Sequence, residues 1–408
     1  MIPSKKIAVV GAGIAGVTAA YYLARKGMQV TVFESTHAAA LVTSYANGGQ
    51  LSVCNTPVWN TWSTVLKGIK WMFTPDAPLQ IKPTWEWRKI QWLARFVATT
   101  QENVHDENTE KLVKLALQSR QAMLKICEDE GLLFDHMQRG ILHVYTREQD
   151  FQAAKRLQSR MENWGCEWQI QDRDTVLRTE SSLNPHMPIV GGIYTSDDST
   201  GDIHKFTTAL ASCCEQKYGV KFRYNTKVTN ISPNRLDVMV HDDLFDLVVI
   251  ANGVAVHELS KQWGDDPGIY PVKGYSITVP LPDLKSQQHA PRVSLLDEHA
   301  KIVTSRLGED RLRIAGTAEL CGYDTSINPS RVQPLIDWCN RWYPNLDTSQ
   351  AQPWAGLRPM TPHMLPCVGK SNRHARVWYH CGHGHLGWTL SAGTAQTLAH
   401  ELAFFGAG

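Results

Sequence analysis

The apolar positions at the start of the chain predict a strand, a helix and a second strand in close succession. Residues 7–10 form an apolar run of strand length, and residues 14–26 carry apolar side chains at helical spacing. Gly27 is a stop signal for that helix, and residues 30–33 form a second apolar run. A helix that connects two such strands is typical of a parallel sheet with a crossover connection.

The region that follows has a helical period. Apolar residues at helical spacing predict helices over 109–130 and 147–164. Thr146 and Gln149 have the spacing of a capping box at the start of the second helix, and Gly165 marks its end. This region therefore differs in character from the strand–helix–strand unit that precedes it.

The rest of the chain is richer in strand signals. An alternation of strand and turn patterns over 266–345 is typical of an antiparallel sheet, and a final helix is predicted over 388–404. Further β-rich apolar runs predict strands at 191–195, 220–224, 246–251 and 376–381.

Together these elements predict an α/β fold with two domains, because a chain of 408 residues exceeds one ordinary domain. We expect a discontinuous nucleotide-binding domain, with an inserted α+β substrate domain on a mostly antiparallel sheet. The nucleotide-binding domain is expected to contain residues 1–60, 205–265 and 350–408. The substrate domain is expected to contain residues 61–204 and 266–349.

Composition and charge are those of a soluble globular protein. Hydrophobic residues make up 43% and charged residues 20%, and a formal net charge of +2 gives no reason to expect a nucleic-acid partner. The nine cysteines form no CxxC pair, which favours reduced thiols in a cytoplasmic protein. Lys5 and Lys6 lead into the first strand rather than into a signal peptide, and no stretch approaches the about 20 apolar residues that span a bilayer.

A glycine-rich turn lies between the first predicted strand and helix. Gly11, Gly13 and Gly16 form a GxGxxG pattern, and Glu34 ends the second predicted strand. The glycines permit a tight turn, close approach of a pyrophosphate and close helix–strand packing. The helix N-terminus favours the phosphate charge, and a carboxylate accepts ribose hydroxyls. The predicted dinucleotide-binding residues are Gly11, Ala12, Gly13, Ile14, Ala15, Gly16, Glu34 and Ser35.

The segment after the second strand is rich in small residues that form hydrogen bonds. Residues 43–50 (TSYANGGQ) are suited to a backbone that lies along an extended ligand, and an ordinary surface loop is the alternative. The predicted cofactor contacts are Ser44, Asn47, Gly48, Gly49, Gln50 and Leu51.

A second GxGxxG pattern, at residues 382–387, lies between a predicted strand and the last helix. A second dinucleotide site is not expected there, because no further strand with a terminal acidic residue follows before Gly408. A helix N-terminus that stabilises negative charge on the N1–C2=O edge of a flavin fits better. The predicted contacts are Gly384, His385, Leu386, Gly387, Trp388 and Thr389.

Histidine and cysteine side chains gather around this second turn. His380, Cys381, His383 and His385 raise the alternative of a metal site. Their spacing matches no standard zinc pattern, and alternation along a strand sends His380 and Cys381 to opposite faces. We therefore predict no metal.

Tryptophans are concentrated between residues 59 and 92, among lysines and arginines. One hypothesis is a peripheral surface that contacts anionic lipid at the inner face of the cell membrane and passes electrons to a quinone. The other is a lid or a domain core covered by the apolar stems of the basic side chains. The tryptophans concerned are Trp59, Trp62, Trp71, Trp85, Trp87 and Trp92.

Six motifs in this order resemble one family over nearly the whole chain. They are GAGIAGVTAAYYLARKG at 11–27, TSYANGGQLS at 43–52, KGIKWMFTPDAPL at 67–79, YPVKGYS at 270–276, WAGLRPMTP at 354–362 and GHGHLGWTLSAG at 382–393. Their combination resembles the D-amino acid dehydrogenase branch of the FAD-dependent D-amino acid oxidase/glycine oxidase superfamily.

The resemblance implies a Rossmann-like FAD-binding domain of the glutathione-reductase type. It also implies non-covalently bound FAD and a small D-amino acid or secondary amine as substrate. It pairs Arg358, the arginine of GLRP, with the substrate carboxylate, and a structural salt bridge is the alternative. It places Lys273 and Tyr275 of the VKGY strand near the flavin or substrate, although either residue is alternatively an ordinary part of the sheet. The further cofactor-binding residues expected on this basis are Val228, Ala251, Asn252 and Gly253.

The implied reaction is oxidative deamination by hydride transfer from the substrate Cα to flavin N5. Arg358 would fix the carboxylate, and positioning and electrostatics would lower most of the barrier. The 2-imino acid then hydrolyses to a 2-oxo acid and ammonia. A quinone or O₂ is expected to accept the electrons.

Other reactions remain open at this point. The substrate is alternatively a cyclic or N-substituted amino acid such as D-hydroxyproline, sarcosine or iminodiacetate, or it is glycine. A tRNA-modifying flavoprotein would need a basic groove, and no run rich in lysine and arginine supplies one. An NAD-dependent dehydrogenase is the last alternative, and it would lack the yellow colour of a flavoprotein.

Overall fold

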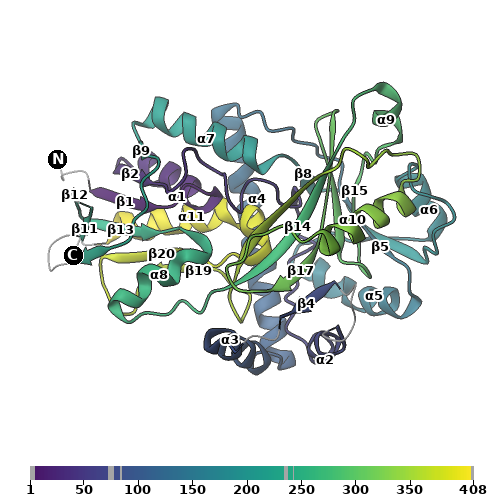
Figure 1. The fold of residues 1–408 in the computed structure, drawn as a ribbon, viewed down its shortest axis with the longest axis horizontal. Coiled ribbons are helices and arrows are strands. Elements are labelled where there is room, and N and C mark those ends of the chain that lie inside the picture. Colours follow the sequence, from purple (N-terminus) through teal and green to yellow (C-terminus); the bar gives the residue numbers. More distant parts are fainter. Residues whose placement is uncertain (1–4, 72–77, 83–84, 234–237, 242, 406–408) are drawn as a thin grey trace.

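The computed structural model describes residues 5–71, 78–82, 85–233, 238–241 and 243–405. Two large sheets lie next to each other, one of six strands and one of nine (Figure 1). The six-stranded sheet is mostly parallel and the nine-stranded sheet mostly antiparallel, so the α/β class with a Rossmann-like part is confirmed.

The six-stranded sheet is parallel except at one edge, where β19 (Cys367–Lys370) and β20 (Val377–Cys381) are antiparallel. Ile7 and Val9 of β1 pack in one hydrophobic core, and Ala8 and Val10 pack in another. Burial on both faces explains why the central strands are apolar throughout. The order of the strands is β19 (Cys367–Lys370), β20 (Val377–Cys381), β13 (Leu247–Ile250), β1 (Lys6–Val10), β2 (Gln29–Phe33) and β9 (Lys221–Arg223).

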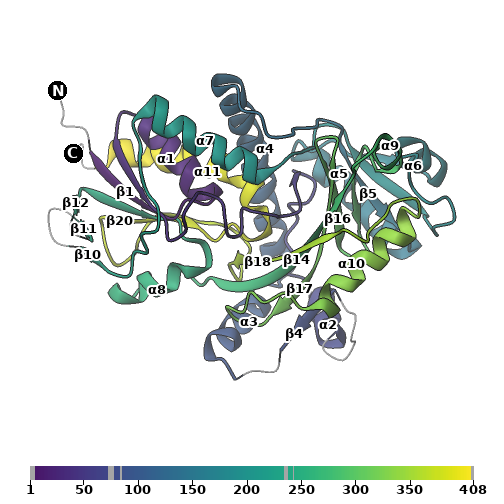
Figure 2. The same ribbon diagram turned by 45° about the horizontal axis from the view of Figure 1, so that its top comes forward.

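Four helices pack together over one face of this sheet (Figure 2). They are α1 (Ile14–Arg25), α4 (Glu102–Glu130), α7 (Ile203–Tyr218) and α11 (Gly387–Phe404). The other face is covered by α8 (Val256–Ser260) and by an antiparallel sheet of β10 (Ile231–Pro233), β11 (Val238–Val240) and β12 (Asp243–Phe245).

The nine-stranded sheet is antiparallel apart from the pairs β15–β5 and β17–β4. Tyr275 and Ile277 of β14 point to a core that is closed by α10 (Pro329–Trp342), whereas Gly274 and Ser276 point to the opposite side. Its order is β18 (Gln352–Met360), β14 (Tyr270–Pro280), β17 (Arg311–Leu320), β16 (Ile302–Leu307), β15 (Ser294–Asp297), β5 (Ile141–Tyr145), β7 (Gly191–Thr195) and β6 (Gln169–Gln171), with β4 (Leu79–Ile81) beside β17.

Shorter elements complete the described fold. The helices are α2 (Trp62–Trp71), α3 (Trp87–Ala98), α5 (Glu148–Asn163), α6 (Arg173–Thr179) and α9 (Leu284–His289), with single 3₁₀ turns η1 (Gly253–Ala255), η2 (Lys261–Trp263) and η3 (Gly384–Leu386). The strands β3 (Gln50–Leu51) and β8 (Ser199–Thr200) form a small pair of their own.

Several local predictions need correction. The helix predicted over 109–130 begins earlier, at Glu102, because its first turns are polar and lack the apolar period. The capping box at Thr146 is wrong, since Arg147 is the N-cap of α5 and no side-chain cap forms. The region 266–345 contains antiparallel strands as expected, but it also contains α10, whose proline-containing sequence concealed its helical period.

Within the described residues, no helix combines the length and the apolar composition that crossing a bilayer requires.

The contact between α11 and α4 provides a test of the packing. A Cβ at Gly393 would lie 2.8 Å from the Ser119 Cα atom, so we expect Gly393→Val to push the two helices apart. Overpacking of this kind lowers the free energy of unfolding by about 1–3 kcal/mol. Urea unfolding would measure the loss. Gln396→Val, at an exposed position of the same helix, is the matched control and should change the unfolding midpoint little.

Candidate active site

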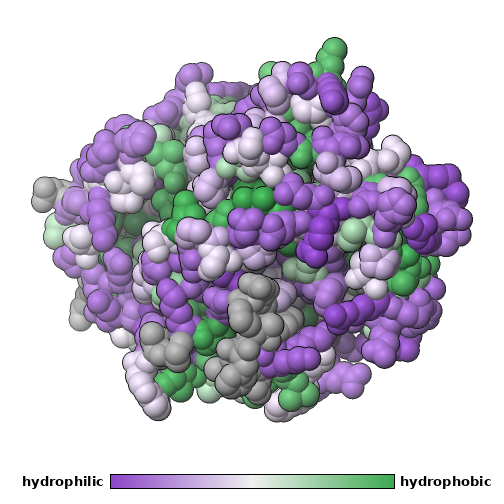
Figure 3. Space-filling view, turned by 45° about the vertical axis from the view of Figure 1, so that its right-hand side comes forward, coloured by the Kyte–Doolittle hydropathy of each residue, from purple (hydrophilic) through white to green (hydrophobic). Residues whose placement is uncertain are grey.

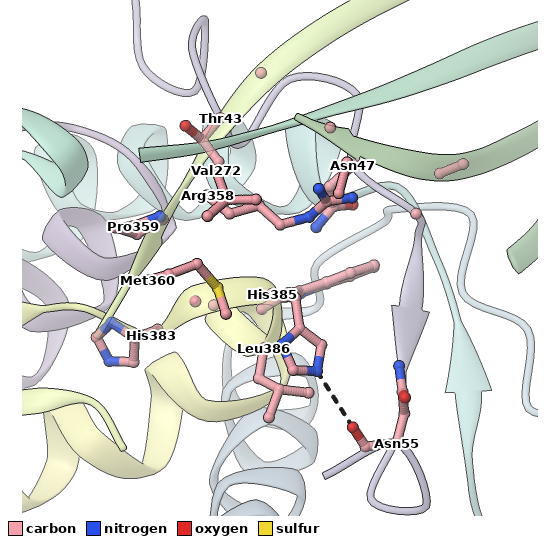
Figure 4. Close-up of a pocket in the computed structure, with 18 of the residues that line it drawn as sticks. Thr43, Asn47, Asn55, Val272, Arg358, Pro359, Met360, His383, His385 and Leu386 are labelled. Atoms are coloured by element: carbon pink, nitrogen blue, oxygen red, sulfur yellow. Dashed lines mark hydrogen bonds between the residues drawn. The ribbon is translucent and has the colours of Figure 1, made fainter. Parts of the chain in front are cut away.

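A cavity of about 1350 Å³ is lined by residues from both large sheets (Figure 4). The six-stranded sheet contributes the carboxyl ends of β1, β2 and β20, which is where open parallel sheets bind ligands. The nine-stranded sheet contributes β14, β17 and β18. Because most small-molecule sites measure about 300–1,000 Å³, this cavity has room for a dinucleotide and a small second ligand.

The turn after β1 brings two backbone segments into close contact. Gly11 has a φ of +104°, and a Cβ there would lie 2.8 Å from the Ala251 carbonyl oxygen. A Cβ at Gly16 would lie 1.8 Å from the Gly11 carbonyl oxygen. The N-terminus of α1 therefore packs tightly behind this turn, and Gly13 and Ile14 line the cavity. That arrangement suits a phosphate group.

Glu34 presents a carboxylate to the same part of the cavity. Its Oε2 atom accepts a hydrogen bond of 2.7 Å from the Ala12 amide. Its Oε1 atom accepts hydrogen bonds from the Ser35 hydroxyl at 3.0 Å and from the Thr36 amide at 2.9 Å. A carboxylate has about four acceptor positions, so Oε2 can still accept from a ligand hydroxyl.

The loop at residues 43–50 is held between the two sheets. The Ser44 hydroxyl accepts from the Ile14 amide at the start of α1, at 3.0 Å. On the other side, the Ser305 hydroxyl donates to the Gly48 carbonyl at 2.6 Å, and Arg313 donates to the Asn47 carbonyl at 3.1 Å. The loop lines the cavity and is therefore not an ordinary surface loop.

The second glycine turn, at residues 382–387, leads through η3 into α11. His380 faces α1 and α11, where its ring bonds the Ala15 carbonyl at 2.9 Å and the Thr394 hydroxyl at 2.8 Å. Burial lowers the pKa of His380 to about 4, so the ring is neutral. Cys381 packs in the opposite core, as the alternation predicts. Across the described part of the chain, no group of three or more His, Cys, Asp or Glu side chains has the arrangement of a metal site.

Next along this turn, His385 faces the cavity below Arg358 (Figure 4). Its ring stacks on Trp59 with a centroid distance of 4.2 Å, and its Nε2 atom lies 3.4 Å from the Asn55 carbonyl oxygen. Burial and the Arg358 charge lower the pKa of His385 to about 3. The side chain is therefore a neutral aromatic wall.

The guanidinium of Arg358 lies inside the cavity, and burial lowers its pKa to about 10. No carboxylate among the described residues pairs with it. The side chain crosses the neighbouring strand at Gly274, where a Cβ would lie 2.1 Å from the Arg358 Nη1 atom. A glycine in the strand interior is thus required for this position of the arginine. A desolvated cation without a protein partner is suited to bind an anion.

The strand that carries Arg358 is also connected to the second glycine turn. Met360 forms an isolated antiparallel bridge with His383. Because Met360 ends β18, the backbone of the arginine strand and the backbone of the turn are held side by side.

Tyr275 lines the cavity, but its hydroxyl is directed to the other side of β14. It donates to Glu319 at 2.7 Å, and Glu319 also lies 3.3 Å from the Lys273 ammonium. Burial and the bond to Glu319 raise the pKa of Tyr275 to about 12. Lys273 itself is 1% exposed and also bonds Asp324 at 3.2 Å, so it supports Tyr275 from behind rather than lining the cavity.

Residues 6–401 match the protein family described as FAD dependent oxidoreductase. The chain belongs to that family. This FAD-dependent oxidoreductase is 46% identical to the D-amino acid dehydrogenase 3 of Mesorhizobium japonicum, over 98% of this chain and 97% of that protein. It is 38% identical to the D-amino acid dehydrogenase of Dechloromonas aromatica, over 98% and 97% of the two chains.

Solved structures share the fold of this FAD-dependent oxidoreductase. The glycine oxidase of Geobacillus kaustophilus has a TM-score of 0.75 at 22% identity, over 98% of this chain and 95% of that chain. The L-α-glycerophosphate oxidase of Mycoplasma pneumoniae, solved with FAD bound, has a TM-score of 0.71 at 19% identity, over 99% and 94%.

The residues of the cavity fit FAD. The positive-φ glycine at position 11 and the N-terminus of α1 suit a pyrophosphate, and Glu34 suits a ribose. The cavity continues from there to the second glycine turn and Arg358, so a long ligand and an amino acid can share it.

Most of the predicted site residues are brought together around this one cavity. Its lining includes Gly11, Gly13, Ile14, Ala15, Glu34, Ser35, Ser44, Asn47, Gly48, Gly49, Gln50, Val228, Ala251, Asn252, Gly253, Tyr275, Arg358, Gly384, His385, Leu386, Gly387, Trp388 and Thr389. Ala12, Gly16, Leu51 and Lys273 lie outside the lining, and Ala12 and Gly16 take part through the contacts given above.

Sequence reasoning missed other residues of the cavity. Gly274 stands within the quoted VKGY motif, and a glycine inside a predicted strand was a signal that another group approaches closely. His143, Glu298 and Lys301 carried no comparable signal, because they come together only through the pairing of distant strands.

The cofactor contacts can be tested at Gly11. We expect Gly11→Ala to weaken FAD binding about tenfold, because both its φ and its contact with Ala251 disfavour a side chain. Flavin absorbance relative to protein absorbance after dialysis would measure the loss. Gly131→Ala is the matched control, because Gly131 has a φ of +61° but a Cβ there would meet no atom within 4 Å. Retention of FAD by both variants would contradict the assignment.

Proposed function

We propose that this FAD-dependent oxidoreductase oxidatively deaminates small D-amino acids. The observation that carries the proposal is the guanidinium of Arg358, which lies in the cavity without a carboxylate partner among the described residues. An amino acid supplies that partner. The relatives named D-amino acid dehydrogenase support the D configuration.

The cofactor is held non-covalently along the two glycine turns. Gly11, Gly13 and the N-terminus of α1 would hold the pyrophosphate, Glu34 would bind a ribose, and residues 382–389 would hold the flavin. Bound FAD supplies an acceptor for the hydride that leaves the substrate Cα. The proposed cofactor domain comprises residues 1–60, 205–265 and 350–408, and the proposed substrate domain comprises residues 61–204 and 266–349. Within these bounds, α4 packs on the six-stranded sheet and β18 belongs to the nine-stranded sheet.

Arg358 binds the substrate carboxylate through two parallel hydrogen bonds and so fixes the position of the Cα atom. The neutral ring of His385, stacked on Trp59, covers the site and limits the entry of water. Tyr275 forms part of the wall, and Lys273 acts on it as a positioning residue by holding Glu319 against the tyrosine hydroxyl. The product is a 2-imino acid, which water converts to a 2-oxo acid and ammonia.

The role of Arg358 can be tested by substitution. We expect Arg358→Ala to retain FAD but to lose about a hundredfold or more in kcat/KM with D-alanine, because a charge-assisted contact to the substrate is removed. Flavin bleaching under anaerobic conditions would measure the rate, with sarcosine, glycine and D-hydroxyproline assayed in parallel. Arg178→Ala, at an exposed arginine of α6 outside the cavity, is the control. An Arg358→Ala enzyme with unchanged kcat and KM would refute the assignment.

The electron acceptor is a quinone at a membrane surface, and an exposed apolar face on and beside α2 and α3 supports this part of the proposal. Trp62 is 58% exposed and Trp87 73% exposed, whereas Trp92 is buried in the core. On the face shown in Figure 3, separate hydrophobic residues lie among hydrophilic ones along the lower edge. Aromatic side chains on amphipathic helices suit the lipid interface.

Vesicle binding tests this surface. We expect the protein to co-sediment at low salt with vesicles that contain an anionic phospholipid, and Trp62→Ser/Trp87→Ser to reduce the bound fraction several-fold. Leu284→Ser is the control, because Leu284 is 75% exposed on the distant α9. If the wild-type protein stays in the supernatant, or reduced enzyme reacts with O₂ faster than with a quinone analogue, this acceptor assignment is wrong.

A further inference from the structure

The cavity has a second polar end, formed by His143, Glu298 and Lys301. His143 lies on β5, and the other two residues lie in the turn between β15 and β16. The His143 Nδ1 atom donates to Glu298 at 2.8 Å, and the Lys301 ammonium donates to the other oxygen of Glu298 at 2.5 Å. None of these residues takes part in the functions assigned above.

This turn is held in a strained shape that directs both charged side chains to the cavity. Lys301 has a φ of +56°, which is unfavourable for any residue with a side chain. The Asp297 carboxylate fixes the turn by accepting from the His299 amide at 2.9 Å and the Ala300 amide at 3.0 Å. Trp338, from α10 on the outer face, donates to the same carboxylate at 2.8 Å. Strain that is maintained from outside in this way is typical of functional sites.

The polar end also has unused hydrogen-bonding capacity. The side chain of His143 is 4% exposed, and its Nε2 atom is buried without a partner in the described part of the chain. Lys301 has three N–H donors, and Glu298 is its ion-pair partner among the described residues. A buried ring nitrogen without a partner is rare in proteins, so a ligand or a water molecule is expected there.

Strand register places this end in line with Arg358. The guanidinium of Arg358 lies over Gly274, which pairs with Ala318 of β17. Val303 of β16 pairs with Ala315, and Lys301, two residues before Val303, lies beyond the paired residues at the level of Thr317, one residue from Ala318. Two strand spacings separate β14 from β16, which is about 10 Å. Burial, and after it the charges of Arg358 and Lys301, lower the pKa of His385, so both cations act on this ring.

Charges of both signs surround the polar end. Lys67, Arg147 and Lys301 line the cavity together with Asp150 and Glu298, and the buried carboxylate of Asp297 also acts on Lys301. Glu298 is occupied by both His143 and Lys301, so it has little capacity left to bind a cation. The remaining donors on Lys301 favour an acceptor with negative charge.

We propose that Lys301, supported by Glu298 and His143, binds a second carboxylate at the far end of the substrate. The preferred substrates are then D-amino acids with a carboxylate at the end of the side chain, long enough to reach from Arg358 to Lys301. This inference rests on the proposed function, because it assigns the α-carboxylate to Arg358.

Binding of straight-chain dicarboxylates to the FAD-loaded enzyme tests the inference independently of turnover. The series runs from succinate to sebacate, with monocarboxylates of equal length as controls, and the change in flavin absorbance reports binding. We expect affinity to peak at an intermediate length, about tenfold above the matched monocarboxylate, because only that length engages both cations. Lys301→Met should remove the peak. Lys114→Met, at an exposed lysine of α4 paired with Glu110, should keep it.

Three outcomes would overturn the inference. They are an affinity that does not depend on length in the wild-type enzyme, a peak that survives in Lys301→Met, and tighter binding of 6-aminohexanoate than of the dicarboxylates. The last result would mean that Glu298 recognises a cation.

Bleaching by D-alanine separates this test from that of the proposed function. If D-alanine bleaches the flavin but no length peak exists, only the second carboxylate site is wrong. If the peak exists but no D-amino acid bleaches the flavin, only the reaction is wrong.

Discussion

A charged guanidinium inside a protein is unfavourable unless an anion compensates it, and the surroundings of Arg358 are arranged around that constraint. The nearby carboxylate of Glu319 lies behind β14, where Tyr275 and Lys273 occupy it, so it is not available to the arginine. Gly274 leaves space for the side chain to cross the strand. The cation is therefore held in place with its hydrogen-bonding capacity open to a ligand.

The two sheets contribute different kinds of surface to the cavity around Arg358. The six-stranded sheet ends in tight turns whose backbone can approach a ligand closely, and its parallel strands place those turns at one edge. The nine-stranded sheet instead offers a broad face on which side chains from distant segments stand in rows. A cofactor with many polar atoms suits the first kind of surface, and a small charged substrate suits the second.

Much of the fold and of the cofactor site could be predicted from the sequence, because their signals are local. The glycine pattern at Gly11, Gly13 and Gly16 specifies its own strand, turn and helix, and all three glycines lie where the pattern requires. The resemblance of the GLRP motif drew attention to Arg358, which does lie in the cavity. The role of Lys273 behind Tyr275 could not be foreseen, because it depends on Glu319 from a neighbouring strand. The helix α10 was missed because two prolines interrupt its pattern.

The bridge between Met360 and His383 has a consequence for how enzymes of this shape can diverge. It joins the strand that carries Arg358 to the second glycine turn, so the proposed carboxylate anchor is held at a fixed distance from the proposed flavin site. A change of substrate preference is then expected at the opposite wall. There, side chains in the turn between β15 and β16 can be substituted without disturbing either glycine turn. Substitutions in that turn would therefore change which substrates fit while the geometry at Arg358 is kept.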